Sequence, residues 1–394
     1  MIRKKLDNIT EEDIEDLIVN EELESKTIEY KSELPPNNYE SRKKFLASVV
    51  SFINTIGGDL IFGIQEDRST GKPSSHEGIS LPNAEQEVLR LEQMIRNGIE
   101  PIPPSSVYRT KIIQQQNNNY IFILRLGRSW LRPHRISLSS KSKFYARATN
   151  GKYPMDIQEI RSSILLSETV VNQIRQFKEE RVSIIDANES FAPLNIGPKI
   201  IIHILPIASF ELGYYINASQ IRTQRWRPIY SSNSFTYRFN IDGLIYYDKL
   251  QNEQNYYTYV QIFRNGLVEA VDARLLQPDE QRKIFLSPQI ENQILVAIKR
   301  YLGSMINLGI ELPYFIFITF TEIKDYTITL LTGSSEPIDR DTLLLPEFMI
   351  ETEDYVVEKL IKSTFDSLYN AFGLENHFHF NEEGSCDPSD RTVW

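Results

Sequence analysis

Residues 24–34 read ESKTIEYKSEL and place two carboxylates, Glu24 and Glu29, close to Lys31. Such charges are either ordinary solvent-exposed surface charges or part of a functional site. Alternation of apolar and polar residues predicts a strand over IEYK, in which Glu29 and Lys31 share a face. Glu24 precedes Glu29 by an odd spacing, which puts the two on opposite faces of a regular strand. They share a site only if Glu24 lies in the turn before the strand, or if a bulge intervenes.

A second acidic pair, Glu66 and Asp67, follows the apolar strand predicted at GDLIFGI. Alone, an acidic pair after a strand is usually solvated. If this strand and TIEYK belong to one sheet, a carboxylate from each could converge at its edge. Clustered carboxylates repel one another, and proteins tolerate them chiefly where a divalent cation neutralises them. Such clusters hold Mg²⁺ or Mn²⁺ for phosphodiester cleavage, because the metal polarises the phosphate and activates water.

A basic segment follows in a chain whose formal net charge is −10. Between positions 125 and 155 there is no Asp or Glu, and Trp130 and His134 lie among the cations. The basic residues are Arg125, Arg128, Arg132, Arg135, Lys141, Lys143, Arg147 and Lys152. A basic strip with aromatic residues suits a nucleic-acid backbone. The alternative is a solvated positive face.

The glycine pair Gly57 and Gly58 does not predict a phosphate-binding loop. A P-loop runs from strand to helix, so that the helix N-terminus faces the phosphate. Here the pair follows an apolar helical pattern over 39–56 and precedes a strand. The sequence therefore predicts a helix C-terminal turn, whose dipole repels anions.

Length and composition favour a folded protein with more than one domain. The chain has 394 residues, of which 41% are hydrophobic and 24% charged, and these are ordinary globular values. One cysteine, Cys386, excludes a disulfide framework and a cysteine zinc site,. With no long apolar run and no apolar segment after the first residues, we expect a cytoplasmic protein.

The predicted fold class is α+β, with an N-terminal α/β domain and a second α+β domain. We place the first domain at 1–182, a linker at 183–197, the second domain at 198–380 and a mobile tail at 381–394. The first element is a helix capped by Thr10, and the second half is rich in tyrosine and β-forming residues,.

Together these stretches resemble the Alba-like domain of the Schlafen family, in its bacterial type. The resemblance rests on ESKTIEYK, SFINTIGGDLIFGIQED, FILRLGRSWLRPH and FYARATNGKYPM, which occur in that order. It covers roughly residues 10–170, about the first two fifths of the chain.

The resemblance implies a site as well as a fold. Vertebrate Schlafen relatives that cleave tRNA and rRNA use three carboxylates and Mg²⁺ or Mn²⁺. The matching positions are Glu24, Glu29 and either Glu66 or Asp67. The third position has two alternatives because GIQED contains an extra residue, which leaves the alignment ambiguous by one position. Lys31 matches the motif lysine, which is a candidate for contacting phosphate.

We therefore expect a metal-dependent endoribonuclease that acts on structured, tRNA-like RNA, with a role in antiphage or stress defence. One alternative is a non-catalytic nucleic-acid-binding or regulatory module. Another is a ligand-sensing first half with an effector second half. The vertebrate nuclease core has two related lobes, whereas one is apparent here, so we also expect a homodimer or higher homo-oligomer.

Overall fold

The computed structural model divides the chain into two compact units, Met1–Thr169 and Val170–Trp394. The division lies within helix α4 (Ile157–Asp186), before the linker expected at 183–197. The described residues are 1–375, except 3, 5, 68–71, 116, 139–142, 150, 191, 211–214, 232–234, 249–254, 279–281, 331–332 and 352–354. The expected tail at 381–394, with Cys386, lies outside them.

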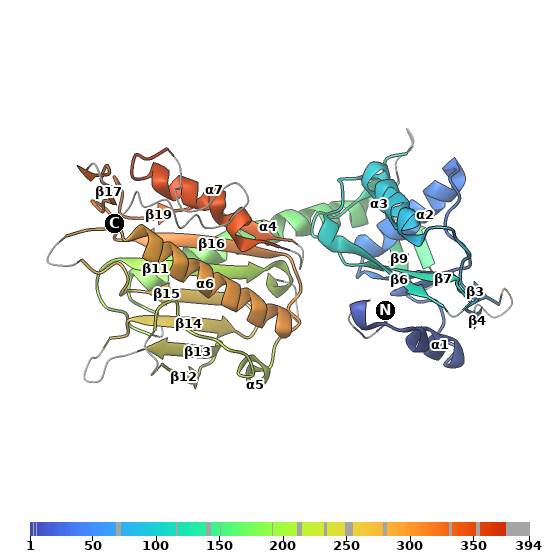
Figure 1. The fold of residues 1–394 in the computed structure, drawn as a ribbon, viewed down its shortest axis with the longest axis horizontal. Coiled ribbons are helices and arrows are strands. Elements are labelled where there is room, and N and C mark those ends of the chain that lie inside the picture. Colours follow the sequence, from blue (N-terminus) through green and yellow to red (C-terminus); the bar gives the residue numbers. More distant parts are fainter. Residues whose placement is uncertain are drawn as a thin grey trace. The chain divides into compact units, whose positions relative to one another are not determined.

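A four-stranded sheet forms the centre of the first unit, in the order β1-β2-β7-β6 (Figure 1). The strands are β1 (Ile28–Lys31), β2 (Gly58–Phe62), β6 (Tyr108–Gln114) and β7 (Tyr120–Leu126). β1 and β2 are parallel, and the other pairs are antiparallel. Three hairpins or bridges flank the sheet: β3 (Gln65–Glu66) with β4 (Pro73–Ser75), β5 (Ile99–Glu100) with β8 (Arg135–Ile136), and β9 (Tyr145–Ala148) with β10 (Gly151–Pro154).

Helices cover both faces of this sheet. Helices α2 (Tyr39–Ile53) and α3 (Ala84–Gly98) share one apolar core with the side of the sheet that carries Leu60 and Phe62. Helix α1 (Glu11–Val19) packs on the opposite side, in a core that contains Ile28 and Tyr30. Because side chains alternate along a strand, Glu29 and Lys31 are directed to the α2 side.

Local sequence signals explain how these elements begin and end. Thr10 and Asp13 form a capping box at the start of α1, as predicted,. At the end of α2 the Gly57 N–H donates to the Phe52 carbonyl oxygen at 3.0 Å, and Gly57 has a φ of 77°. Glycine adopts this left-handed conformation readily. A Cβ at Gly57 would also collide with the Leu126 carbonyl oxygen. The predicted turn from α2 into β2 is confirmed.

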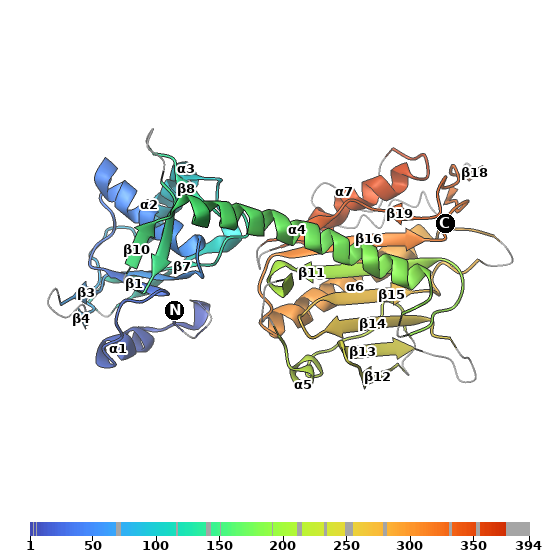
Figure 2. The same ribbon diagram turned by 180° about the vertical axis from the view of Figure 1, so that it is seen from behind.

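An eight-stranded sheet forms the second unit, and every neighbouring pair in it is antiparallel (Figure 2). Its order is β12-β13-β14-β15-β11-β16-β19, with β20 also paired to β16. The strands are β11 (Lys199–Pro206), β12 (Thr236–Phe239), β13 (Gly243–Asp248), β14 (Thr258–Phe263), β15 (Val268–Asp272), β16 (Tyr314–Thr321), β19 (Leu343–Leu344) and β20 (Phe348–Ile350).

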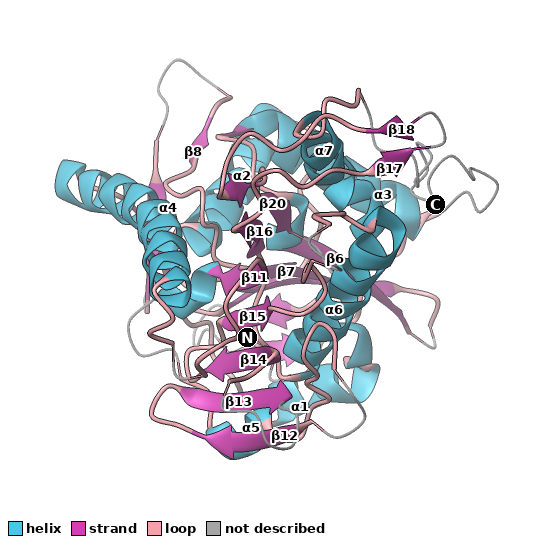
Figure 3. Ribbon diagram, turned by 90° about the vertical axis from the view of Figure 1, so that its left-hand side faces the viewer, coloured by secondary structure: helices cyan, strands magenta, loops and turns pink. Residues whose placement is uncertain are grey.

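Helices also cover both faces of the second sheet. Helices α6 (Ser287–Asn307) and α7 (Val357–Asn370) pack on one face, and the C-terminal half of α4 packs on the other. The smaller elements are η1 (Leu6–Asn8), η2 (Ser105–Val107), η3 (Ile207–Phe210), α5 (Ala218–Ile221), β17 (Thr329–Leu330) and β18 (Gly333–Ser334). Helices and strands coexist in both units (Figure 3), which confirms the predicted α+β class. In the described part of the chain, no helix is long and apolar enough to cross a membrane.

A buried polar network fixes α4 to the second sheet. Arg181 donates from Nε and Nη2 to the two carboxylate oxygens of Glu269 at 2.7 and 2.8 Å. The Tyr259 hydroxyl donates to Glu269 at 2.8 Å, and His203 Nε2 lies 3.1 Å from its carboxylate. Burial would raise the pKa of Glu269, but the hydrogen bonds from Arg181 and His203 lower it to about 2,.

We expect Glu269→Gln to lower the free energy of unfolding at pH 7 by on the order of 3 kcal/mol. The folded pKa near 2 lies below the ordinary value of 4.5. The charge therefore stabilises the fold fully above pH 4.5, and this contribution is lost as the pH falls towards 2. Urea unfolding followed by the fluorescence of the buried Trp226 measures the difference between wild type and variant. That difference should shrink from pH 7 to pH 2.5, and an unchanged difference would contradict the assignment.

Candidate functional site

Glu24 and Glu29 converge on Lys31. Glu24 lies in the turn before β1, and its Oε1 accepts a hydrogen bond from the Tyr30 backbone N–H at 2.9 Å. This is one of the two arrangements that the odd spacing allowed. Lys31 Nζ lies 3.6 Å from Glu24 Oε1 and 3.1 Å from Glu29 Oε1.

Glu29 is a buried carboxylate surrounded by cations. It is 3% exposed, and Arg147 Nη1 donates to its Oε2. Its Oε1 accepts from the Ser48 hydroxyl of α2 at 2.8 Å and lies 3.6 Å from Lys152 Nζ. Burial would raise the pKa of Glu29, but Lys31, Lys152 and Arg147 together lower it to about 2,. Glu29 is therefore ionised and fully engaged.

Arg147, on β9, joins three parts of the first unit. Its Nε donates to the Ser25 carbonyl oxygen at 3.1 Å, in the turn that precedes β1. Its guanidinium lies 4.2 Å from the centre of the Phe52 ring of α2, a cation–π distance. The same side chain thus fixes the turn that carries Glu24, the strand that carries Glu29, and the helix behind them.

The third carboxylate near Lys31 is Glu66, on β3. Burial raises the pKa of Glu66, and the neighbouring negative charge of Glu24 raises it further, while Lys31 opposes the shift,. Asp67 is exposed, and its backbone N–H donates to the Lys72 carbonyl oxygen at 2.9 Å. Glu66 thus has Glu24 and Lys31 as electrostatic neighbours.

These side chains form what we call the charge cluster. It consists of Glu24, Glu29, Glu66, Lys31, Arg147 and Lys152. Three carboxylates face three cations, so the cluster is close to neutral without an ion. Burial lowers the pKa of Lys152, and Lys31 and Arg147 lower it further despite Glu29.

Several basic residues of the segment 125–152 are engaged inside the first unit. Arg125 donates to both carboxylate oxygens of the buried Asp59, at 2.8 and 3.0 Å. Arg132 is 9% exposed. Arg147 and Lys152 belong to the charge cluster. Phosphate contact requires accessible cations, so we expect these four to stabilise the first unit and not to bind a nucleic-acid backbone.

The remaining residues of that segment are nearer to solvent. Arg128 and Lys143 are exposed, and Arg135 is partly buried. Arg135 Nη2 lies 2.7 Å from the exposed Glu100 carboxylate, a surface pair that contributes little to stability. Lys141 lies outside the described residues.

Asn54, which the sequence analysis did not single out, and His134 organise the same segment. The Asn54 amide nitrogen donates to the carbonyl oxygens of His134 and Tyr145 at 2.9 and 3.0 Å, and its oxygen accepts from the His134 backbone N–H at 2.7 Å. His134 itself is fully buried, with Nε2 lying 2.6 Å from the Ser129 hydroxyl, and burial lowers its pKa to about 4. A polar residue at the end of an apolar helix, Asn54, is the sequence signal that could have indicated this role.

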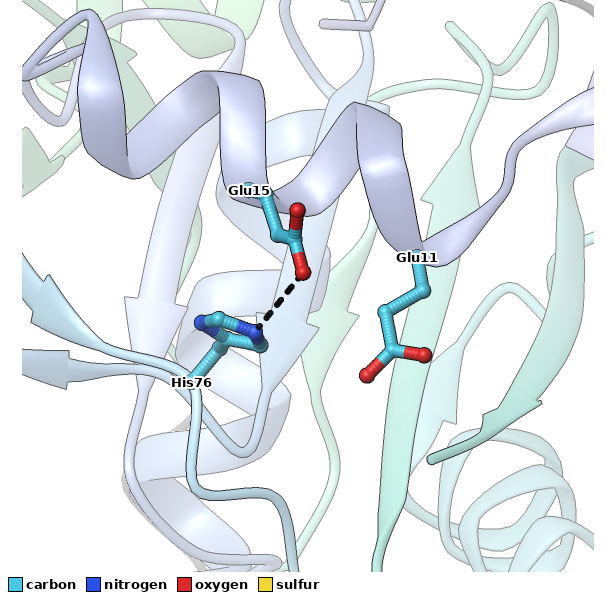
Figure 4. A group of neighbouring side chains, drawn as sticks. All are labelled: Glu11, Glu15 and His76. Carbon is cyan, nitrogen blue, oxygen red and sulfur yellow. Dashed lines mark ion pairs between the residues drawn. The ribbon is translucent and has the colours of Figure 1, made fainter. Parts of the chain in front are cut away.

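Among the described residues, one group has the geometry of a metal site, and it is not the charge cluster. Ligand atoms of Glu11, Glu15 and His76 all lie within 4.8 Å of one another. The two glutamates are four positions apart on α1, so both face His76 (Figure 4),. His76 Nε2 lies 3.7 Å from Glu15 Oε1. Exposed acidic groups of this kind are common without an ion, and we assign none. The group shares no residue with the charge cluster.

The residues of the charge cluster lie within the range that matches a known family. Residues 24–156 match the family described as Schlafen, AlbA_2. No curated protein matches the sequence. Among solved structures, the chain is similar to the N-terminal domain of a RecG-related protein from Nitrosomonas europaea, a relative of an ATP-dependent DNA helicase. The identity is 16%, the match covers 32% of this chain and 81% of that chain, and the TM-score is 0.26. This likeness is too weak to support an argument.

We expect Glu29→Gln to destabilise the first unit by about 3 kcal/mol, because it leaves Arg147 buried without a countercharge. Glu24→Gln changes a partly exposed carboxylate and should cost less than about 1 kcal/mol. Thermal unfolding of both variants beside wild type measures the contrast. Equal stability of the two variants would show that Glu29 does not anchor the cluster.

Proposed function

The chain carries a Schlafen AlbA_2 domain over residues 24–156, and from this premise we propose that it is a metal-dependent endoribonuclease. A domain of this type indicates a nucleic-acid-related function. The finer proposal is that the first unit binds structured, tRNA-like RNA and cleaves its phosphodiester backbone at the charge cluster. A role in antiphage or stress defence belongs to the same proposal and rests on the family resemblance.

The observation that supports cleavage is the convergence of carboxylates from separate stretches of the sequence. Glu24 comes from a turn, Glu29 from β1 and Glu66 from β3, and Lys31 lies beside them. Lys31 is 42% exposed in its side chain, so its ammonium group can reach a phosphate while the carboxylates stay in place. The exposed Arg128 and Lys143 supply further contacts for an anionic backbone,.

We propose that a divalent cation binds between two of the three carboxylates. Glu24 raises the pKa of Glu66, as expected of two like charges that are incompletely compensated, and a cation between them would relieve this repulsion. Glu29 fits less well, because Arg147, Ser48 and Lys31 already occupy its oxygens. We therefore propose Glu24 and Glu66 as the metal-binding residues and Glu29 as a positioning residue. The bound Mg²⁺ or Mn²⁺ would polarise the phosphate and lower the pKa of a bound water molecule.

Three residues near the proposed metal site have different roles. Lys31 would bind a non-bridging phosphate oxygen. Glu29 holds Lys31 and Lys152 on the α2 side of the sheet, so that neither ammonium group turns away from the cluster. Burial lowers the pKa of Lys152, so we propose it as the group that gives up or accepts a proton.

We expect the Glu24→Ala and Glu66→Ala variants each to lose at least about 100-fold in RNA cleavage, because each removes a metal-binding carboxylate. The assay uses purified protein with total tRNA and, separately, single-stranded and duplex DNA, in Mg²⁺, Mn²⁺ or EDTA. Discrete RNA fragments that require the metal are the expected product.

The matched control is Asp67→Ala, an exposed carboxylate next to Glu66 in sequence. It should cleave like wild type. If Asp67→Ala loses cleavage while Glu66→Ala keeps it, Asp67 is the third carboxylate. Full cleavage by Glu24→Ala would reject the proposed site. Glu29→Ala is unsuitable as the diagnostic variant, because we expect it to destabilise the unit.

A second function, non-catalytic nucleic-acid binding, is favoured by the charge balance of the cluster. Three cations neutralise three carboxylates, so the carboxylates need no metal to coexist. In that case Glu24, Glu29 and Glu66 are structural, and the exposed cations alone contact the backbone.

Binding without cleavage gives a different set of results. Nucleic acid should stay intact with every cation, while a mobility shift weakens as salt rises, because phosphate contacts release counterions. Lys143→Glu should weaken binding about tenfold and flatten the salt dependence. The control, Lys111→Glu, changes a lysine of β6 that contacts the Asp7 carbonyl oxygen and lies outside the basic segment. Binding that does not depend on salt would contradict both functions.

A further inference from the structure

The eight-stranded sheet of the second unit has two unlike edges. At one edge, two short strands, β19 and β20, pair with β16 and cover parts of it. At the other edge, β12 pairs with β13 alone among the strands of the described chain. All four residues of β12 are exposed. Open edges are normally shortened, charged or covered, because they offer free backbone groups to another strand.

The turn between β12 and β13 determines which backbone groups are directed outward. Asn240 and Gly243 exchange both backbone hydrogen bonds, at 3.0 and 3.3 Å. In an antiparallel ladder such pairs alternate with pairs that exchange none. Arg238 therefore bonds to β13, whereas the N–H and C=O groups of Tyr237 and Phe239 are directed away from the sheet. The free edge presents a regular row of donors and acceptors.

The side chains at this edge are aromatic. Tyr237 and Phe239 lie two positions apart, on the face of the sheet that carries Tyr246, and they are 42% and 49% exposed. The Tyr237 ring lies 5.5 Å from the Tyr246 ring and 6.2 Å from the Phe239 ring. Ile241, in the following turn, is 88% exposed. Exposed apolar side chains gathered along an open edge are typical of an interaction surface.

We propose that β12 pairs with β12 of a second copy of this chain, about a two-fold axis perpendicular to the sheet. Such an axis makes the two strands antiparallel and keeps equivalent side chains on the same face. Two positions of this axis pair the largest number of β12 residues with β12 of the second copy. One passes through Tyr237 and its copy, and the other through Arg238 and its copy.

The residues at the edge favour the axis through Tyr237. An axis through Arg238 would set two guanidinium groups directly opposite each other, and like charges in that position are destabilising. The axis through Tyr237 sets Tyr237 opposite its copy and Phe235 opposite Phe239. In both of these pairs the outward backbone N–H and C=O groups of the two residues face each other, so the two residues of each pair exchange two hydrogen bonds. Arg238 then faces Thr236. The strand matches a second copy of itself in backbone phase and aromatic character, and this axis keeps the two Arg238 side chains from facing each other, which is why a second copy is the partner we assign.

Cysteine cross-linking tests the axis directly, in a Cys386→Ser background that removes the single natural cysteine. In Tyr237→Cys the paired Cα atoms would lie about 5.5 Å apart, within the range of a disulfide. In Arg238→Cys the equivalent residues are diagonal neighbours more than about 7 Å apart, too far to be bridged. Oxidation should therefore give a covalent dimer of the first variant and not of the second. Cross-linking through position 238 alone would overturn the proposed axis.

Sedimentation velocity tests the interface without a cross-link. Wild type should sediment as a dimer at micromolar concentration, and Tyr237→Lys should shift it to monomer, because the two lysines would be directly opposed. Tyr215→Lys changes an exposed tyrosine of the same unit that lies outside β12, and should leave the dimer intact. A monomeric wild type, or a dimer that persists in Tyr237→Lys, would overturn the proposal.

Discussion

The arrangement of the first unit depends on one buried ion pair, Arg147 with Glu29. The Glu29 carboxylate faces the apolar layer between the sheet and α2, where an unpaired charge would be unfavourable. The Arg147 guanidinium from β9 neutralises it,. The same guanidinium reaches the Ser25 carbonyl oxygen and the Phe52 ring. Because these contacts hold the turn before β1 against α2, the position of Glu24 follows from that of Glu29.

This constraint divides the charge cluster into two parts. Around Glu29 the cations are close and buried, and the carboxylate is held ionised by them. Around Glu24 and Glu66 the carboxylates are partly exposed and share Lys31, and the negative charge of Glu24 adds to burial in raising the pKa of Glu66. The neutralised interior around Glu29 therefore supports an outer part in which the carboxylate charges are less fully compensated.

The sequence predicted those structural features that are determined by residues close to one another in the chain. The capping box at Thr10, the strand at IEYK and the turn at Gly57 all follow from signals a few residues long. Alternation also placed Glu29 and Lys31 on one face, where the structure has them 3.1 Å apart.

Partners from distant parts of the chain were not predictable in the same way. The basic segment was visible as a run of cations, but its composition does not say that Arg147 and Lys152 are directed inward. The strand pairing at Glu66 has an irregular register between β3 and β4, which has no clear signature in GIQED.

Each unit relies on a buried Glu–Arg pair between distant residues, 118 positions apart for Glu29 and Arg147 and 88 apart for Glu269 and Arg181. The cost of removing both charges from water leaves such pairs with little net stabilisation. What each pair contributes is discrimination, since any packing that separates the partners leaves a buried charge alone. In the first unit this fixes the strand that carries the candidate site, and in the second it fixes the helix that lies on the sheet.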